Sequence, residues 1–339
     1  MTKLKRHKTF TFLRDAFVLL ITLILTACPN NAGDFVNIIP PANGIVGMEP
    51  SYPLPGEDDY WKGVFIKDRK VNLSPYKLGK TEVTYELWHS VLKWNTENSK
   101  NYTFANQGRE GSNGAVGAEP TDAGKTEPVT EVSWLDCIVW CNAYTEMMNG
   151  SDTECIYRKS YTDTTVLKDA MDGAACDAAY ADMNKKGYRL PTEAEWEFAA
   201  RGGDVSAPDW DFGFAGTDDF NAADDYAWHS GNISFLNAGA ITEIIDIHPI
   251  GQKKPNRLGL YDMSGNCWEW CFDRYNSRLP GEFIDPINNM GARPRIIKSG
   301  SARNPPAFAR VKSWGYATPV NPGYILGFRL AQTIVKDNQ

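Results

Sequence analysis

The sequence predicts an α+β domain with a high coil content. Three segments have the apolar spacing and flanking residues of helices, whereas the segments typical of strands are short and far apart. Two long polar stretches, 105–125 and 203–225, lie between these elements, and loops of that length inside a domain are usually functional. Residues 59–332 contain no linker-like stretch and no internal repeat, so this range is predicted to be one domain.

The predicted helices share a capping residue at the start and an apolar face. They are 84–94, 133–148 and 192–201. Two of them open like capping boxes, with a hydroxyl followed three residues later by a carboxylate: Ser133 with Asp136, and Thr192 with Glu195. Runs of β-branched and aromatic residues predict strands at 63–66, 76–83, 296–299 and 327–331.

Composition excludes several classes of function. The 339 residues are 42% hydrophobic and 23% charged, as in a globular protein. The formal net charge is −7, and residues 1–27 contribute +4, which leaves −11 on the remainder. Such an acidic body argues against a nucleic-acid partner. Four histidines are too few to favour a metal or catalytic centre built from histidine.

The chain has seven cysteines and no C-x-x-C pair, which excludes zinc-ribbon and thioredoxin-like motifs. Six cysteines remain besides Cys28. This even number in an exported chain allows one or two disulfides, and a Cys155–Cys176 bond would close a loop. The sequence leaves the pairing open.

The N-terminus has the pattern of an export signal. A basic segment, 3–14, precedes an apolar run, 16–25, whose ten residues are too few for a membrane-spanning helix. The run ends in Leu-Thr-Ala-Cys28, which resembles the bacterial lipobox, in which the cysteine is lipidated. An ordinary signal peptide that reaches a cysteine by chance is the alternative. We expect a lipoprotein anchored in a membrane, the outer membrane with surface exposure, through its lipid alone. The predicted parts are a signal peptide 1–27, a lipidated Cys28 and Pro-rich spacer 28–58, the domain 59–332 and a tail 333–339.

Five stretches in order carry a family resemblance. They read LGKTEVT (78–84), PVTEVSW (128–134), RLPTEAEWE (189–197), LGLYDMSGNCWEW (258–270) and GFRL (327–330). Together they resemble the formylglycine-generating enzyme (sulfatase-modifying factor) family. The resemblance implies an elaborated C-type lectin fold with a small twisted antiparallel sheet, two main helices and much loop. In such a domain Trp196, Trp268 and Trp270 are expected in the core, and Arg189, Glu193, Glu195 and Glu197 are expected as caps and internal ion pairs.

The resemblance also bears on catalysis. The family's oxidase holds copper with two cysteines that follow a G-G-S element, and here the matching positions carry Asn304 and Ala309. Neither residue offers the thiolate that Cu(I) prefers, so we expect no copper and no enzyme activity. A second branch holds iron in a histidine cluster, whereas His89, His229 and His248 stand alone here.

Residues 302–325 have neither helical nor strand periodicity, and they mix aromatic rings with four Pro and two Gly. This composition is typical of paratopes. The segment resembles the variable region of the proteins that diversity-generating retroelements mutate, among them variable lipoproteins of treponemes. Mutation of template Asn codons at adenine never yields Lys, Glu, Gln, Met or Trp, and only Lys312 and Trp314 of that set occur here.

This resemblance predicts two kinds of position. Fixed scaffold positions are Lys312, Trp314, Ala307, Ala309, Arg310, Val311 and Pro319. Ligand-binding, variable positions are Ala302, Arg303, Asn304, Pro305, Phe308, Ser313, Gly315, Tyr316, Ala317, Thr318, Val320, Asn321, Gly323, Tyr324 and Ile325. We expect Tyr316, Tyr324, Phe308 and Arg303 to anchor a protein or other macromolecular ligand. The alternative is a fixed loop in a relative of the sulfatase-modifying enzymes that acts in surface-protein modification.

The resemblance further implies a structural calcium ion. Its ligands would be carboxylates of Asp262 and Glu269 and backbone carbonyls of Gly265 and Cys267. The alternative is that the two carboxylates cap turns beside the tryptophans.

Overall fold

The computed structural model describes residues 34–112, 114–232, 247–288 and 294–335. The predicted signal peptide, Cys28 and the end of the predicted tail lie outside these ranges. Residues from Asp34 onward form one compact unit. In the described part of the chain, no helix is both long enough and apolar enough to cross a membrane.

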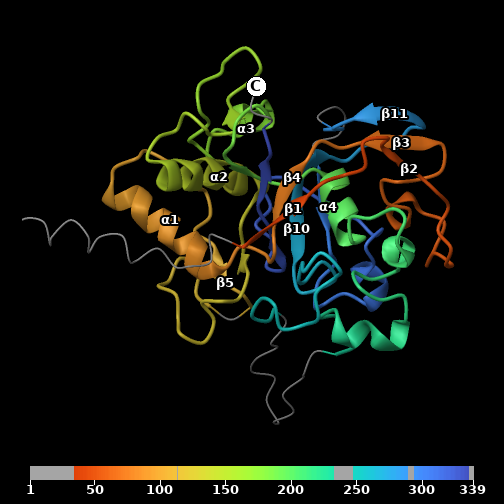
Figure 1. Cartoon of the computed structure of the whole chain (residues 1–339). Helices are drawn as coiled ribbons and strands as arrows, with labels where there is room; N and C mark the ends of the chain where they lie inside the picture. The colour runs from red at the N-terminus through yellow and green to blue at the C-terminus, as the bar shows by residue number, and fades with distance from the viewer. Residues whose placement is uncertain (1–33, 113, 233–246, 289–293, 336–339) are drawn as a thin grey trace, which may run out of the picture. The chain divides into compact units, whose positions relative to one another are not determined.

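The three predicted helices are present and begin where their caps predicted. They are α1 (Tyr85–Glu97), α2 (Trp134–Asn149) and α4 (Glu193–Ala200), and a short α3 (Gly173–Asp177) adds a fourth. Both capping boxes form, at Ser133 with Asp136 and at Thr192 with Glu195. Figure 1 shows α1 and α2 side by side, away from α4 and the strands around β10. Single 3-10 turns lie at Asp59–Trp61, Pro208–Asp211, Phe220–Asp225 and Pro306–Ala309.

Strands form three sheets of three or four strands, not one. The first is antiparallel, in the order β1 (Phe35–Ile38), β4 (Tyr76–Gly79), β15 (Ala331–Thr333), β9 (Tyr188–Arg189). The second has the order β13 (Gly315–Ala317), β12 (Arg295–Lys298), β10 (Trp268–Arg274), β14 (Leu326–Gly327), with β10 and β14 parallel. The third has the order β11 (Gly281–Ile284), β3 (Arg69–Asn72), β2 (Ile45–Val46). Two small ladders join β5 (Arg109–Glu110) to β6 (Val129–Thr130) and β7 (Tyr157–Arg158) to β8 (Tyr180–Ala181). The α+β class with much coil is thus confirmed.

Two predicted boundaries are wrong. Residues 63–66 contain no strand. The spacer predicted over 28–58 is folded from Asp34, because Phe35–Ile38 pairs with β4 along its whole length and Ile38 and Ile45 are buried. The prolines of this region suggested a linker, but Pro40 and Pro41 lie in the short connection between β1 and β2.

Tryptophans supply much of the core, as predicted. Trp88, Trp134, Trp140, Trp196 and Trp270 are fully buried, and the rings of Trp88 and Trp140 stack with centroids 5.6 Å apart. Their indole N–H groups reach acceptors, for example Trp270 Nε1 to the Val132 carbonyl at 3.1 Å. Large rings with satisfied polar ends let this loop-rich domain bury enough apolar area to fold.

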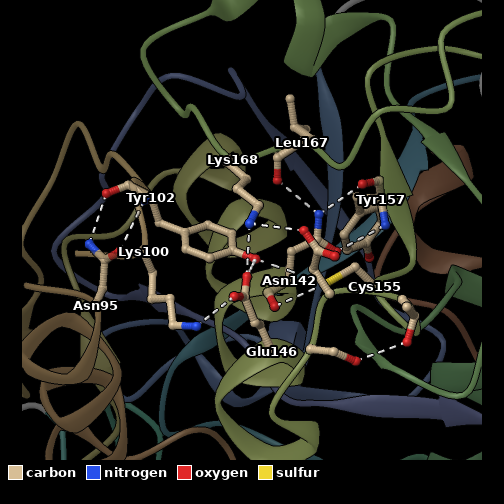
Figure 2. Close-up of polar contacts among 12 residues, drawn as sticks. Asn95, Lys100, Tyr102, Asn142, Glu146, Cys155, Tyr157, Leu167 and Lys168 are labelled. Atoms are coloured by element: carbon tan, nitrogen blue, oxygen red, sulfur yellow. Dashed lines mark hydrogen bonds and ion pairs between the residues drawn. The ribbon is translucent and has the colours of Figure 1, made fainter. Parts of the chain in front are cut away.

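The cysteine count allowed one or two disulfides, but the six described cysteines are all free and buried. The Cys155 thiol instead donates to the Asn142 carbonyl at 3.2 Å. Beside it, Figure 2 shows Glu146 of α2 accepting a hydrogen bond from the Tyr102 hydroxyl at 2.8 Å and ion pairs from Lys100 and Lys168. These contacts join the end of α2 to the loops on either side of it.

Candidate functional site

Residues 302–325 leave the core after β12 and return to it at β14. The connection starts at Gly300, whose φ is +73° and where a Cβ would lie 2.7 Å from the Phe308 carbonyl oxygen. The segment then makes a 3-10 turn at Pro306–Ala309 and forms β13, an edge strand paired with β12. The second sheet therefore holds the segment at both of its ends.

One set of side chains in the segment points into the protein. Lys312 is buried and pairs with Asp211, and burial lowers the pKa of Lys312 to about 8. Trp314 is buried, donates from Nε1 to the Asp59 carbonyl at 3.0 Å and lies under the Arg278 guanidinium. Ala309, Val311 and Pro319 are also buried, whereas Ala307 and Arg310 are half-buried. These seven are the positions that the sequence predicted to be fixed.

A second set faces solvent. Tyr316, Val320 and Tyr324 are 58%, 60% and 48% exposed. The Arg303 guanidinium lies 4.7 Å from the centre of the Tyr324 ring, and the Tyr316 ring lies 4.9 Å from that of Tyr275. Pro305, Thr318 and Asn321 are exposed as well. The exposed set contains both tyrosines and the arginine that the sequence predicted as anchors.

Other predicted ligand positions are less accessible. Ala302 and Ser313 are buried, so placing them at a ligand surface is wrong. Phe308 is half-buried against Trp61, with ring centroids 5.0 Å apart. Half-buried positions also include Asn304, Gly315, Ala317, Gly323 and Ile325. Sequence analysis did not single out Tyr275, whose ring contacts that of Tyr316 from outside the segment.

Trp268 connects the two parts of this surface. Its Nε1 donates to Asn304 Oδ1 at 2.8 Å, and a Cβ on Gly315 would lie 3.5 Å from the far edge of its ring. The Asn304 amide oxygen also accepts from Ser301 Oγ at 2.7 Å. Asn304 thus stabilises the segment from within.

The positions that match the oxidase cysteines carry no redox-active group. Ala309 packs with Phe214, Ala223 and Ala227. The thiols of Cys267 and Cys271 lie in the core, where burial raises the pKa of both well above the usual range. Such thiols are inert as nucleophiles.

The histidines have separate surroundings. His248 stacks on Trp228 with ring centroids 3.6 Å apart, and burial lowers the pKa of His248 to about 4. His229 Nε2 lies 2.9 Å from Asp224 Oδ1, and His89 lies 3.8 Å from Glu119. Among the residues that the structure describes, no three His, Cys, Asp or Glu side chains are grouped to hold a metal ion.

The predicted calcium ligands fit only in part. Both oxygens of Glu269 accept from Arg329 at 2.6 Å, and one also accepts from Trp196 Nε1 at 2.7 Å. The Gly265 carbonyl accepts from Ser299 Oγ at 2.8 Å. A calcium ion beside Glu269 would meet the Arg329 cation, so this carboxylate does not fit the predicted role.

Asp262 interacts with a second buried carboxyl group, Glu82, which the sequence did not single out. Asp262 Oδ1 and Glu82 Oε2 are buried and have no hydrogen-bond partner. Burial raises the pKa of Asp262 to about 6 and that of Glu82 well above its usual range, and the Asp262 charge raises the latter further. Calcium takes about six to eight oxygen ligands, so these two carboxyl groups would form only part of a calcium site.

Comparison with known proteins identifies the family of this chain. A profile of the sulfatase-modifying factor enzyme 1-like domain (FGE-sulfatase) matches residues 48–334. Chaperone protein LppX of Paenibacillus barcinonensis is 32% identical over 218 residues, which cover 61% of this chain and 65% of that protein. The formylglycine-generating enzyme of Streptomyces coelicolor is 31% identical over 152 residues, which cover 43% and 46%. The chain therefore spans less than two thirds of the length of these curated relatives.

A solved structure extends the similarity to the whole domain. Variable protein 1 of Treponema denticola matches with a TM-score of 0.62 and 29% identity, over 88% of this chain and 94% of that one. The chain belongs to the sulfatase-modifying factor enzyme 1-like domain family, which includes both enzymes and non-catalytic relatives.

Proposed function

We propose that this chain is a cell-surface lipoprotein whose domain displays a retroelement-diversified, non-catalytic ligand-binding site. The proposal rests mainly on the division of the side chains within 302–325 into a buried set and an exposed set. Lys312 and Trp314, which adenine mutagenesis of Asn codons cannot produce, are buried, whereas Tyr316, Val320 and Tyr324 are exposed. A framework of this kind allows the exposed positions to change while the backbone stays in place.

The exposed rings suit recognition of a protein or other macromolecule. Tyr and Arg are enriched in binding hot spots, and rigid rings supply contact area at a small entropic cost. Arg303 over Tyr324 and Tyr316 beside Tyr275 provide two such anchors. Similarity to a protein named variable protein 1 supports this role.

Sequencing this locus across many isolates tests the proposal. We expect substitutions to concentrate at the exposed positions, for example Tyr316, Val320 and Tyr324, and to spare Lys312 and Trp314. A segment as invariant as β12 and β14 would overturn diversification.

Membrane attachment through a lipid on Cys28 is part of the proposal. Only residues 29–33 separate Cys28 from the folded unit. Growth with radiolabelled palmitate is expected to label the wild-type chain and not Cys28→Ser. Protease treatment of intact cells then checks surface exposure, and protection from protease would contradict it.

Calcium enters the proposal with Asp262 and Glu82 as the carboxylate ligands, in place of Glu269. A bound calcium ion would supply charge neutralisation for these two buried groups. Calcium in excess over EGTA is expected to raise the melting temperature, because a ligand of the native state stabilises it. Asp262→Asn should abolish that increase, and an unchanged melting temperature in the wild-type chain would remove the site.

The second candidate is a fixed-function relative that assists surface-protein modification. The similarity to a protein named Chaperone protein LppX favours it. Copper analysis and turnover of a sulfatase-derived cysteine peptide separate an enzyme from a binder. Stoichiometric copper with aldehyde formation would contradict the non-catalytic proposal, which expects neither because Asn304 and Ala309 lack thiols.

A further inference from the structure

A hollow of about 440 Å³ lies between α3, the first turn of α2 and Pro319–Val320. Trp134 and Leu135 of α2 line it on one side, and both are buried. Its size falls within the range of ligand-binding pockets. It borders the segment 302–325, but most of the residues that line it lie outside that segment.

The wall made by α3 is built from residues without long side chains. Gly173, Ala174 and Ala178 line the hollow, and a Cβ added at Gly173 would meet nothing within 4 Å. The helix therefore leaves room that a partner's side chain can occupy. The space is open to solvent, because Gly173, Ala174 and Ala178 are exposed.

The charge of the lining favours a neutral occupant. Asp177 is its one charged residue, and Asp177 Oδ1 accepts from Arg274 at 2.8 Å. Arg274 also donates to the Asp177 carbonyl at 2.7 Å. With that carboxylate balanced, the remaining walls are aliphatic or aromatic and offer burial of apolar surface.

We propose that this hollow is the anchor pocket of the ligand site and receives an apolar side chain of a protein ligand. The inference rests on the proposed function, because exposed Val320 belongs both to the pocket and to the predicted variable positions. The backbone N–H of Trp134 donates to the Pro319 carbonyl at 3.0 Å, which holds the wall formed by Pro319 and Val320 against α2. Constant walls then supply the anchor, and Val320 adjusts its fit. Hot-spot residues typically fill pockets that lose their water when the partner binds.

N-acetyltryptophanamide is a suitable probe of the pocket, with binding to the full-length chain measured by ligand-observed NMR. We expect Gly173→Trp, which fills the pocket, to weaken binding at least tenfold. Met171→Trp adds the same ring two residues away on an exposed site outside the lining, and it should change binding less than twofold. Ala174→Phe is a second blocking variant if Gly173→Trp lowers the melting temperature. Val320→Asp should weaken binding several-fold.

Several results would overturn the inference. These are absence of binding, binding unchanged by both blocking variants, or tighter binding of N-acetyllysinamide than of the indole probe. A dimer that Gly173→Trp dissociates would assign the pocket to a second copy of the chain instead. Failure of the proposed function is distinguishable, because it appears in sequencing as an invariant segment 302–325 and leaves binding of the probe unaffected.

Discussion

The interior around α4 and the segment 302–325 use polar and aromatic residues in opposite ways. In the interior, charges are buried in fixed pairs: Arg189 with Glu195, Glu197 with Arg201 and Lys298, and Glu269 with Arg329. In the segment, the rings of Tyr316 and Tyr324 lie at the surface. Buried pairs make a change of either partner costly, whereas exposed rings can be replaced cheaply. The contrast supports the proposal that the exposed positions of 302–325 can change while the fold stays the same.

Breaking the central ion network should have the largest effect. The Glu197 carboxylate accepts from Val64 N–H at 2.9 Å and pairs with Arg201 and Lys298. Glu197→Ala removes the partner of buried Lys298 and leaves Arg201 only a 4.0 Å contact with Asp211, so we expect a loss of about 3–5 kcal/mol in the free energy of unfolding in urea. The control is Glu282→Ala, which removes an exposed partner of Lys70 and should cost less than about 1 kcal/mol. Equal losses in the two variants would refute the contrast between interior and surface.

Within the segment itself, Trp314 should behave as part of the interior. Trp314→Ala removes a buried ring and leaves a cavity under Arg278, so we expect a loss of about 3 kcal/mol. Calorimetry of the variant beside Tyr316→Ala measures the difference between the two sets of positions. A loss below about 1 kcal/mol would remove Trp314 from the scaffold.

A further expected effect concerns pH. Burial and the charge of Glu193 raise the pKa of Asp273 to about 7, while two backbone hydrogen bonds to its carboxylate oppose the rise. Between about pH 4 and 7 the native state holds a proton that the unfolded chain has released, so stability falls as pH rises through this window. Urea unfolding between pH 4 and 8 is expected to show that decrease, and Asp273→Asn should flatten it. A slope that is the same in both chains would assign the effect to other groups.

The sequence predicted local features of the fold better than its boundaries. Capping boxes at Ser133 and Thr192 predicted two helix starts because a cap depends on residues within one turn. The strand Phe35–Ile38 was missed because its partner, β4, lies about forty residues later and nothing local marks it. The sequence left disulfides open, because an even cysteine count says nothing about where each thiol lies, and the structure shows the six described thiols free and buried.

Predictions about the site residues also succeeded in part. Lys312 and Trp314 were predicted to be fixed because adenine mutagenesis of Asn codons cannot produce Lys or Trp, and both residues are buried in the structure. Composition alone could not tell that Ala302 and Ser313 face inward, because small residues suit either environment. The role given to Glu269 failed because Arg329 reaches it from 60 residues away. Contacts between distant segments also create the hollow beside Val320, and no sequence motif predicts this hollow.

The smallest expected effect is the most informative for the comparison. Tyr316, Val320 and Tyr324 are about half exposed or more, and the contacts of both tyrosines lie at the surface. The triple variant Tyr316→Ser, Val320→Thr, Tyr324→Ser should therefore change the free energy of unfolding by about 0.5 kcal/mol per site or less. Thermal unfolding beside wild type and Trp314→Ala measures this. A loss as large as that of Trp314→Ala would mean that the exposed rings stabilise the fold, and a surface needed for folding cannot be free to diversify.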